Sequence, residues 1–392
     1  MRTTFRFDLW RPVLGSWAIS LCPLVLAAAC AAPGGPDGTN LPAGPLQLAW
    51  TFSTEGELDF PPLPVGDVIV VAPSDGPLTA LDMESGRLRW HYGLAGGVWS
   101  RAIATDGERV FVGLKGGKLA ALDAVTGKVR WTRELGIESQ VPAWVAGGIV
   151  YVPTTFVGPE LQPIVEGKAI LFALDAQDGS VRWTFETDNY ILQTPVAVDD
   201  AIYVGGNFAD PRPVDEGGHT RIYALSTDGR TIRWTYESED GFPKRLQATD
   251  EVLVFIGYQD YLNAVDARTG ELRWRRDTGN WVPMFLAIDD TLYYGAANTV
   301  VQALAGQTGE VLWEYNLGGG SFNYVLGAPE FAEGRLYLLT QRGDLVALDS
   351  ADGGLLWQVP TGIRARSGLR AANGWLFASG TEGTVYAYRL ES

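Results

Sequence analysis

A short run of residues recurs seven times along the chain with an opening alanine and a closing tryptophan ten positions apart. An aspartate usually follows the alanine, and a glycine turn separates two apolar runs. The copies are "ALDMESGRLRW" from Ala80, "ALDAVTGKVRW" from Ala121, "ALDAQDGSVRW" from Ala173, "ALSTDGRTIRW" from Ala224, "AVDARTGELRW" from Ala264, "ALAGQTGEVLW" from Ala303 and "ALDSADGGLLW" from Ala347. A motif with a fixed spacing indicates a repeat architecture, in which each unit packs on its neighbours.

Each copy predicts two strands joined by a tight turn. Apolar and β-branched runs such as "RVFVGLKGGKLAALD" are typical of half-buried strands. We expect the aspartate to accept hydrogen bonds from the turn backbone and the glycine to adopt a positive φ. These residues are Asp82, Asp123, Asp175, Asp266 and Asp349, with Gly86, Gly127, Gly179, Gly270, Gly309 and Gly353. Ser226 and Ala305 replace the aspartate in two copies, where we expect looser turns in the same fold.

Two further short strands precede each copy, for instance "VPAWVAGG" and "IVYVPTT" before the third. Four strands in about 40 residues make one propeller blade. The last set, "GTVYAYRLES", ends without a tryptophan, while Trp50 in "LQLAWTFST" has no copy before it. We therefore predict an all-β, eight-bladed β-propeller of four-stranded antiparallel blades, in which the N-terminal strand pairs into the last blade and hides two strand edges.

Eight repeat tryptophans follow from this count, one for each blade. Because an indole needs burial and a hydrogen-bond partner, they are expected to pack between blades. They are Trp50, Trp90, Trp131, Trp183, Trp234, Trp274, Trp313 and Trp357.

The A-x-D-x-x-T-G-x-x-x-W repeat resembles the tryptophan-docking motif of the eight-bladed pyrroloquinoline-quinone (PQQ) type propellers. The resemblance covers residues 45–392. Some members of that family are quinoprotein dehydrogenases. Others, such as the BamB lipoproteins of the outer-membrane protein assembly machinery, bind no cofactor and act as scaffolds.

The first 29 residues have the pattern of a secretory signal peptide, with arginines, an apolar run from Val13 to Ala29 and small residues before Cys30. Cys30 resembles the lipidated cysteine of a bacterial lipobox. The alternative is cleavage near Ala29 with an incidental Cys30. Cys22 would leave with the signal, so Cys30 would have no disulfide partner. Residues 30–45, rich in Pro, Gly and Ala, predict a flexible tether, and residues 46–392 the propeller.

The formal net charge of the chain is −16, and because the leader contributes +2, the rest carries −18. Such an acidic domain does not suit nucleic acid, whose phosphates need a basic surface. We therefore expect protein partners in the cell envelope, membrane attachment through the lipid, and a monomeric propeller.

Successive repeat tryptophans are separated by 40, 41, 52, 51, 40, 39 and 44 residues. The two adjacent long units owe their length to residues 155–168 and 207–220, and the smaller excess falls at residues 316–327. All three are predicted on the face opposite the Asp-Gly turns. Insertions that break a repeat on one face indicate a binding surface, although loop length also drifts at little cost in stability.

The same face is predicted to gather aromatic and basic side chains near the connections between blades. Clustered aromatics favour a protein or ligand contact, and arginines near the axis could receive an anion such as PQQ; the alternative is core packing for some aromatics and ordinary ion pairing for the arginines. The candidates are Trp99, Arg101, Tyr190, Phe242, Arg245, Trp281, Phe322, Tyr324, Arg364 and Arg366.

The sequence offers no catalytic constellation. The two histidines, His91 and His219, are far apart in the repeat scheme. The acidic loop with Asp210, Asp215 and Glu216 lacks the ligand spacing of a calcium loop. We therefore predict no catalytic residue and no metal site.

The hypothesis that unites these features is an exported, membrane-anchored lipoprotein, facing the periplasm or cell exterior, that acts as a non-catalytic protein-binding scaffold without a cofactor. One alternative is a PQQ-dependent dehydrogenase using calcium, although the adjacent cysteine pair of those enzymes is absent. Another is a small-ligand or carbohydrate-binding propeller, for which exposed aromatics such as Trp281 are the argument.

Overall fold

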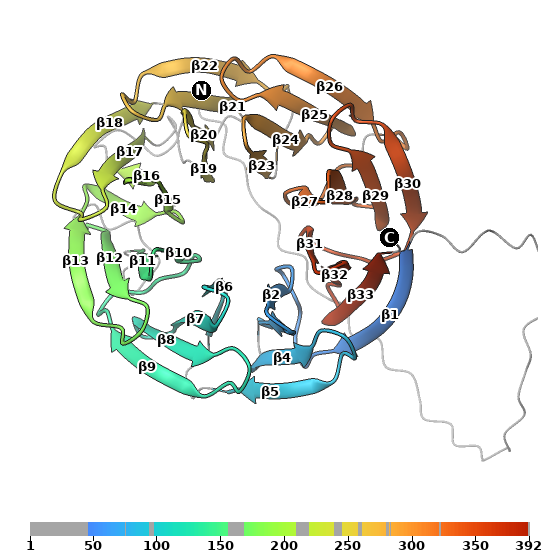
Figure 1. Cartoon of the computed structure of the whole chain (residues 1–392), viewed down its shortest axis with the longest axis horizontal. Coiled ribbons are helices and arrows are strands. Elements are labelled where there is room, and N and C mark those ends of the chain that lie inside the picture. Colours follow the sequence, from blue (N-terminus) through green and yellow to red (C-terminus); the bar gives the residue numbers. More distant parts are fainter. Residues whose placement is uncertain are drawn as a thin grey trace, which may run out of the picture. The chain divides into compact units, whose positions relative to one another are not determined.

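The computed structural model describes residues 46–74, 76–93, 98–155, 168–208, 219–238, 245–257, 261–279, 282, 284–320 and 323–390. They form eight antiparallel sheets arranged as blades around an axis (Figure 1). This confirms the predicted eight-bladed β-propeller. No helix able to cross a membrane occurs among these residues.

Each blade runs from an inner strand at the axis to an outer strand at the rim. Blade 1 is β2 to β5, and the numbering continues to blade 8, which is β31 to β33 plus β1. The inner strands are β2 (Leu63–Val65), β6 (Val98–Thr105), β10 (Trp144–Ala146), β15 (Val196–Val198), β19 (Leu246–Ala248), β23 (Phe285–Ile288), β27 (Glu330–Ala332) and β31 (Leu369–Ala372). The second strands are β3 (Val68–Val71), β7 (Arg109–Leu114), β11 (Ile149–Pro153), β16 (Ala201–Phe208), β20 (Val252–Ile256), β24 (Thr291–Gly295), β28 (Arg335–Leu339) and β32 (Trp375–Ser379).

The third and outer strands contain the repeated motif. The third strands are β4 (Leu78–Asp82), β8 (Lys118–Asp123), β12 (Ile170–Asp175), β17 (His219–Ser226), β21 (Tyr261–Asp266), β25 (Val300–Ala305), β29 (Asp344–Asp349) and β33 (Thr384–Leu390). The outer strands are β5 (Leu88–Tyr92), β9 (Val129–Glu134), β13 (Val181–Glu186), β18 (Ile232–Ser238), β22 (Leu272–Asp277), β26 (Val311–Asn316), β30 (Leu355–Pro360) and β1 (Leu46–Ser53).

Blade 4 departs from the predicted four strands. A fifth strand, β14 (Asn189–Leu192), pairs with the far half of β16, beyond the inner strand β15. Because β16 and β17 are each eight residues long, their extra length exposes backbone that β14 covers. The repeat motif contains no signal for this strand.

Ring closure occurs where the sequence predicts it. Strand β1 pairs antiparallel with β33, and Trp50 lies opposite Ala387, as the tryptophan and alanine do within the other copies. Leu46 pairs with Leu390, so the beginning of β1 and the end of β33 lie together. That end is the face of the motif turns, which we call the turn face; the connections between second and third strands, and between blades, leave from the opposite loop face.

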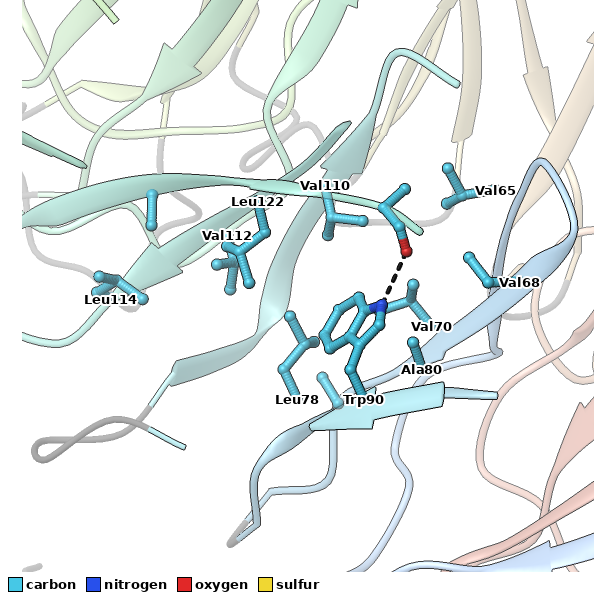
Figure 2. Close-up of a cluster of buried hydrophobic side chains, with 13 residues drawn as sticks. Val65, Val68, Val70, Leu78, Ala80, Trp90, Val110, Val112, Leu114 and Leu122 are labelled. Carbon is cyan, nitrogen blue, oxygen red and sulfur yellow. Dashed lines mark hydrogen bonds between the residues drawn. The ribbon is translucent and has the colours of Figure 1, made fainter. Parts of the chain in front are cut away.

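The repeat tryptophans dock each blade onto the next. In seven blades the indole N–H donates to a carbonyl oxygen in the next blade's motif turn, at 2.8 to 3.2 Å. Figure 2 shows the contact in which Trp90 of blade 1 reaches the carbonyl of Ala124 in blade 2, beside Val110 and Leu122. The prediction that these tryptophans pack between blades is confirmed. Trp357 differs because blade 8 has no motif turn to receive it.

The turn glycines have a second role that the sequence did not reveal. Each has a positive φ, as predicted, but each also lies under the tryptophan ring of the preceding blade. At Gly179, a methyl group would come within 2.6 Å of the Trp131 ring. Gly229 of the irregular fourth copy has the same position under Trp183. The turn therefore needs glycine both for its backbone conformation and for close blade contact.

The motif aspartates accept hydrogen bonds from turn backbone N–H groups, as predicted, for example from Ser85 to Asp82 at 2.8 Å. The expectation of looser turns at the irregular copies is wrong. Gly309 N–H donates to the Ala305 carbonyl at 2.8 Å, as short as the equivalent bond from Gly127 to Asp123. At Ser226 the hydroxyl donates to Asp228 within the turn. The backbone ladder fixes the turn without the aspartate.

Ion pairs link these aspartates to the outer strands. Arg89, Arg130, Arg182 and Arg273 contact the aspartate of their own blade at 2.5 to 2.6 Å. In blade 4, where Ser226 replaces the aspartate, Arg233 pairs with Asp200 instead at 2.7 Å. Hydrogen bonds from the turn and the arginine lower the pKa of Asp82 and Asp123 to about 2, and Arg273 does the same for Asp266.

We expect Gly179→Ala to lower the free energy of unfolding by about 1–3 kcal/mol more than Gly362→Ala, because only the first overpacks a tryptophan contact. Both glycines have φ of +70°, and nothing lies within 4 Å of a methyl group at Gly362. Urea denaturation of the two variants provides the measurement. Equal losses would mean that the cost is in the backbone conformation alone.

We expect stability to fall with acid as the lowered pKa values dictate. Unfolding returns Asp82, Asp123 and Asp266 to a pKa of about 3.9. Their contribution to the free energy of unfolding is therefore complete above that pH and is lost as the pH falls from about 4 to about 2. Replacing all three by Asn should lower stability at pH 7 by about 1 kcal/mol or less per pair and flatten the pH dependence in that window. Unfolding curves measured at several pH values test this; parallel curves for both proteins would contradict it.

Candidate functional site

The two long insertions leave the loop face of adjacent blades, as predicted. The first connects β11 to β12 in blade 3, and the second connects β16 to β17 in blade 4. Residues 156–167 and 209–218, which make up most of both insertions, lie outside the described residues. The structure describes the residues that flank each insertion, and these flanking residues form the base of both loops.

That base joins blades 3 and 4 through buried polar groups. Asn189 of β14 is fully buried, and its amide donates to the carbonyl of Arg221 in β17 at 3.1 Å. Its own carbonyl accepts from Ala169, just before β12, at 2.6 Å. Leu192 N–H donates to the carbonyl of Thr154, at the foot of the first insertion, at 3.3 Å. The feet of both insertions are therefore parts of one hydrogen-bonded unit.

Charged groups surround the same base. Arg221 contacts Asp188 at 2.8 Å and Glu237 at 2.7 Å, which links the start of β14 to the outer strand of blade 4. The Arg221 side chain is only 18% exposed, whereas Asp188 and Glu237 are 63% and 54% exposed, so the arginine of this network is shielded and its carboxylates face solvent. We call residues 154–155, 168–169, 187–192 and 219–221, with the insertions they hold, the blade 3–4 platform.

The third long connection, residues 316–327, does not stand free from the loop face. Asn323 is buried, and its side-chain amide donates to the carbonyl of Gly318 at 3.2 Å. Val325 forms a β-bridge with Thr340 and is fully buried. Residues 323–327 are therefore packed onto blade 7, and the prediction that this connection adds to an elaborated binding surface is wrong for them; residues 316 and 318–320 are exposed.

Three polar side chains, those of Gln247, Glu330 and Arg370, occupy the same position of their inner strands and bridge neighbouring blades. Gln247 of β19 donates to the Phe285 carbonyl at 2.9 Å and accepts from Ala287 N–H in β23. Glu330 of β27 accepts from Ala371 N–H in β31 and pairs with Arg370 at 2.5 Å. These residues belong to no motif of the repeat. Aligning the inner strands of the repeat would have placed them in one register.

Arg245, immediately before β19, has no carboxylate partner among the described residues. Its guanidinium donates to the thioether sulfur of Met284 at 3.7 Å. Burial, together with a smaller effect of repulsion from Arg370 and against the attraction of Glu330, lowers the pKa of Arg245 to about 10. Arg370 is paired to Glu330, so among the residues that the structure describes no carboxylate is left to pair with Arg245.

The other predicted arginines do not form a basic cluster. Arg366 is exposed and pairs with Glu57 and Asp59 at 2.9 and 3.0 Å, which is the ion-pairing alternative. Arg364 is exposed.

The prediction that Arg101 and Arg245 share one register is wrong. Strand pairing places Ala104 of β6 at the position that Gln247 has in β19. Arg245 therefore corresponds to Ala102, and Arg101, whose side chain lies outside the described part, lies one residue earlier.

Most of the predicted aromatics fall outside the part that the structure describes. This holds for Phe242, Trp281 and Phe322, and for the side chains of Trp99 in β6 and Tyr190 in β14. Tyr324 is half-buried and packs against the core cluster of blades 7 and 8. It is therefore a packing residue and does not support an exposed aromatic cluster.

The described chain offers little material for metal or acid–base chemistry. His91 lies in blade 1 and His219 in blade 4, so the two histidines are far apart as predicted. Nowhere in the described ranges do three His, Cys, Asp or Glu residues gather in a cluster that could hold a metal ion.

Sequence comparison identifies the relatives of this chain. The sequence model of the family described as "Outer membrane protein assembly factor BamB" matches residues 47–140, 93–211, 136–243 and 218–392. The protein of that name from Burkholderia pseudomallei is 26% identical over 285 residues, which are 68% of each chain. The one from Yersinia pestis is 24% identical, over 64% of this chain and 62% of its own. A polyvinylalcohol dehydrogenase from Pseudomonas is 26% identical over 46% of this chain.

Comparison with solved structures agrees on the fold. BamB from Moraxella catarrhalis covers 88% of this chain and 98% of its own, with a TM-score of 0.61 and 24% identity. A quinohemoprotein alcohol dehydrogenase from Pseudomonas putida covers 88% of this chain and 76% of its own, with a TM-score of 0.64 and 16% identity. At these identities the likeness establishes the propeller fold alone.

We expect Arg245→Met to raise the free energy of unfolding by about 0.5–2 kcal/mol, because it removes a partly desolvated cation for which the described residues supply no carboxylate partner. The matched change Arg366→Met should not raise it, because it removes only exposed ion pairs to Glu57 and Asp59. Thermal denaturation of both variants checks this. A destabilised Arg245→Met protein would show that the arginine supports the fold.

Proposed function

The chain belongs to the family described as outer membrane protein assembly factor BamB, and from that premise we propose that it is a non-catalytic scaffold that binds protein partners in the cell envelope. The observation that carries the proposal is the blade 3–4 platform. Two insertions break an otherwise regular repeat, and they rise from one buried hydrogen-bonded base on one face. A rigid base lets long loops bind a partner with a smaller loss of conformational entropy.

We also propose that the chain is exported and attached to a membrane by a lipid on Cys30. Support comes from the apolar leader, the small residues before Cys30 and the Pro- and Gly-rich segment that follows. Cys30 and the tether lie outside the described residues. Because β1 begins on the turn face, the tether joins the propeller on the face opposite the platform.

A second candidate function is the binding of a small anion at the inner ring. The observation that favours it is Arg245, whose guanidinium has no carboxylate partner among described residues. Arginine binds planar carboxylates well, and PQQ carries such groups. The adjacent cysteine pair of PQQ enzymes is absent, since the only cysteines are Cys22 and Cys30. Calorimetric titration with PQQ and calcium tests this candidate: saturable binding that Arg245→Met abolishes would support it, and no heat of binding would exclude it.

We expect a stoichiometric partner to be lost when the insertions at 155–168 and 207–220 are shortened to the repeat length. The tagged chain is crosslinked in intact cells, purified in detergent and compared with the shortened variant by mass spectrometry. Val125→Ser is the control, because Val125 is 54% exposed on the turn face and its replacement should leave the partner bound. Identical partners with and without the insertions would contradict the platform as the binding surface.

A further inference from the structure

The outer strands carry a regular line of exposed apolar residues around the rim. The residue two positions before each repeat tryptophan is apolar and between 41% and 49% exposed. The eight residues are Leu48, Leu88, Val129, Val181, Ile232, Leu272, Val311 and Leu355. In blades 1 to 5 the next residue is an arginine, which the structure pairs with an acidic group.

Blades 6, 7 and 8 lack this arginine. Leu312 and Leu356 replace it and are 55% and 46% exposed, and Ala49 replaces it in β1. Asp349, the aspartate that such an arginine would contact in blade 7, forms no ion pair among described residues. We call Val311, Leu312, Leu355, Leu356 and Leu48 the apolar sector. These three blades are consecutive in the ring (Figure 1).

The three outer strands of the apolar sector carry little charge. Strands β30 (LLWQVP) and β1 (LQLAWTFS) contain no charged residue, and β26 contains only Glu314. The outer strands of blades 1 to 5 each carry at least one arginine. Charged side chains on an edge strand discourage other strands and apolar surfaces from binding there. The three adjacent outer strands β26, β30 and β1 lack these arginines, although the chain as a whole has a net charge of −16. Their exposed apolar side chains therefore form a surface on which another apolar surface can bind.

The N-terminal segment indicates which surface lies near the apolar sector. The sector includes β1, whose first residue, Leu46, follows directly from the tether. If Cys30 carries a lipid, as in the proposed function on which this step rests, 15 residues separate the anchor from β1. A flexible segment of that length spans about 20 Å on average and about 50 Å fully extended. The anchoring bilayer is therefore within reach of the apolar sector.

We propose that the apolar sector rests on the surface of the bilayer that holds the lipid anchor. Its leucine and valine side chains enter the boundary between headgroups and acyl chains, where exposed apolar side chains lose contact with water. The strands that face the lipid carry little charge, which minimises the repulsion between an acidic protein and anionic headgroups. Blades 3 and 4 lie on the opposite side of the ring from blades 7 and 8 (Figure 1), so the platform is held away from the membrane.

The test uses the lipidated full chain in vesicles of phosphatidylethanolamine and phosphatidylglycerol that contain spin-labelled lipid. An environment-sensitive fluorophore is attached at Leu356→Cys or, as the matched control, at Val181→Cys. Both positions are 46% exposed, on blades 7 and 3. We expect several-fold stronger quenching and a blue-shifted emission at Leu356→Cys only.

A second variant restores the rim residue of the other blades. Leu312→Arg combined with Leu356→Arg lets Asp349 form the ion pair seen in blade 1, so the fold should be kept, as circular dichroism can check. With the fluorophore at Leu48→Cys, quenching should fall to the level of the Val181→Cys control.

Equal quenching at the two matched positions would overturn the proposal while leaving the anchor in place. Quenching absent in vesicles, with the fluorophore shielded in intact envelopes, would also overturn it and assign the sector to a protein partner. A chain that does not float with vesicles would remove the lipid anchor and the inference together. If it still captured the insertion-dependent partner, the scaffold function would stand without them.

Discussion

The structure depends on one contact repeated around the ring, the indole of each blade lying over the motif turn of the next. The N–H group fixes direction through a hydrogen bond to a turn carbonyl, and the glycine beneath the ring allows the close approach. The spacing of ten residues follows from this contact. In blade 1, Ala80 and Trp90 pair across the hairpin with a bulge beside them, and the same bulge recurs in the other copies. Because each blade contacts only its neighbours, repeating one good contact is enough to set the architecture.

The fold was predictable from sequence because the docking motif is local and repeated. Even the closing strand could be identified, since Trp50 and Ala387 are the two halves of a single motif. The parts that escaped prediction depend on contacts between segments distant in sequence. Strand β14 forms because the lengthened β16 leaves backbone to be paired, and Arg366 pairs with Glu57 across 309 positions. The bridges made by Gln247 and Glu330 could not be predicted from the motif, because these residues lie in the short inner strands and their partners lie about 40 positions away in the next blade.

A nearly symmetric ring thus supports an asymmetric distribution of features. Blades 3 and 4 carry insertions on a shared buried base, and the outer strands of blades 6 to 8 have Glu314 as their only charged residue. The ion pairs on the outer strands of blades 1 to 5 tolerate replacement of the acidic partner. In blade 4, where the motif aspartate is missing, Arg233 pairs with Asp200. The scaffold can therefore vary its surface blade by blade, because the tryptophan contact that holds it together lies beneath that surface.

The seam between the first and last strands sets the order in which the molecule can form. Thr54 donates to the carbonyl of Gly383, 329 positions later, and Trp357 finds no motif turn in blade 8. Local hairpins can form as soon as their residues are available, but this pairing must wait for almost the whole chain. Until then, the nascent protein is an open arc whose two ends expose bare β-edges. A cell that makes this protein has to keep those two ends apart from other chains during the interval between synthesis of the first strand and synthesis of the last.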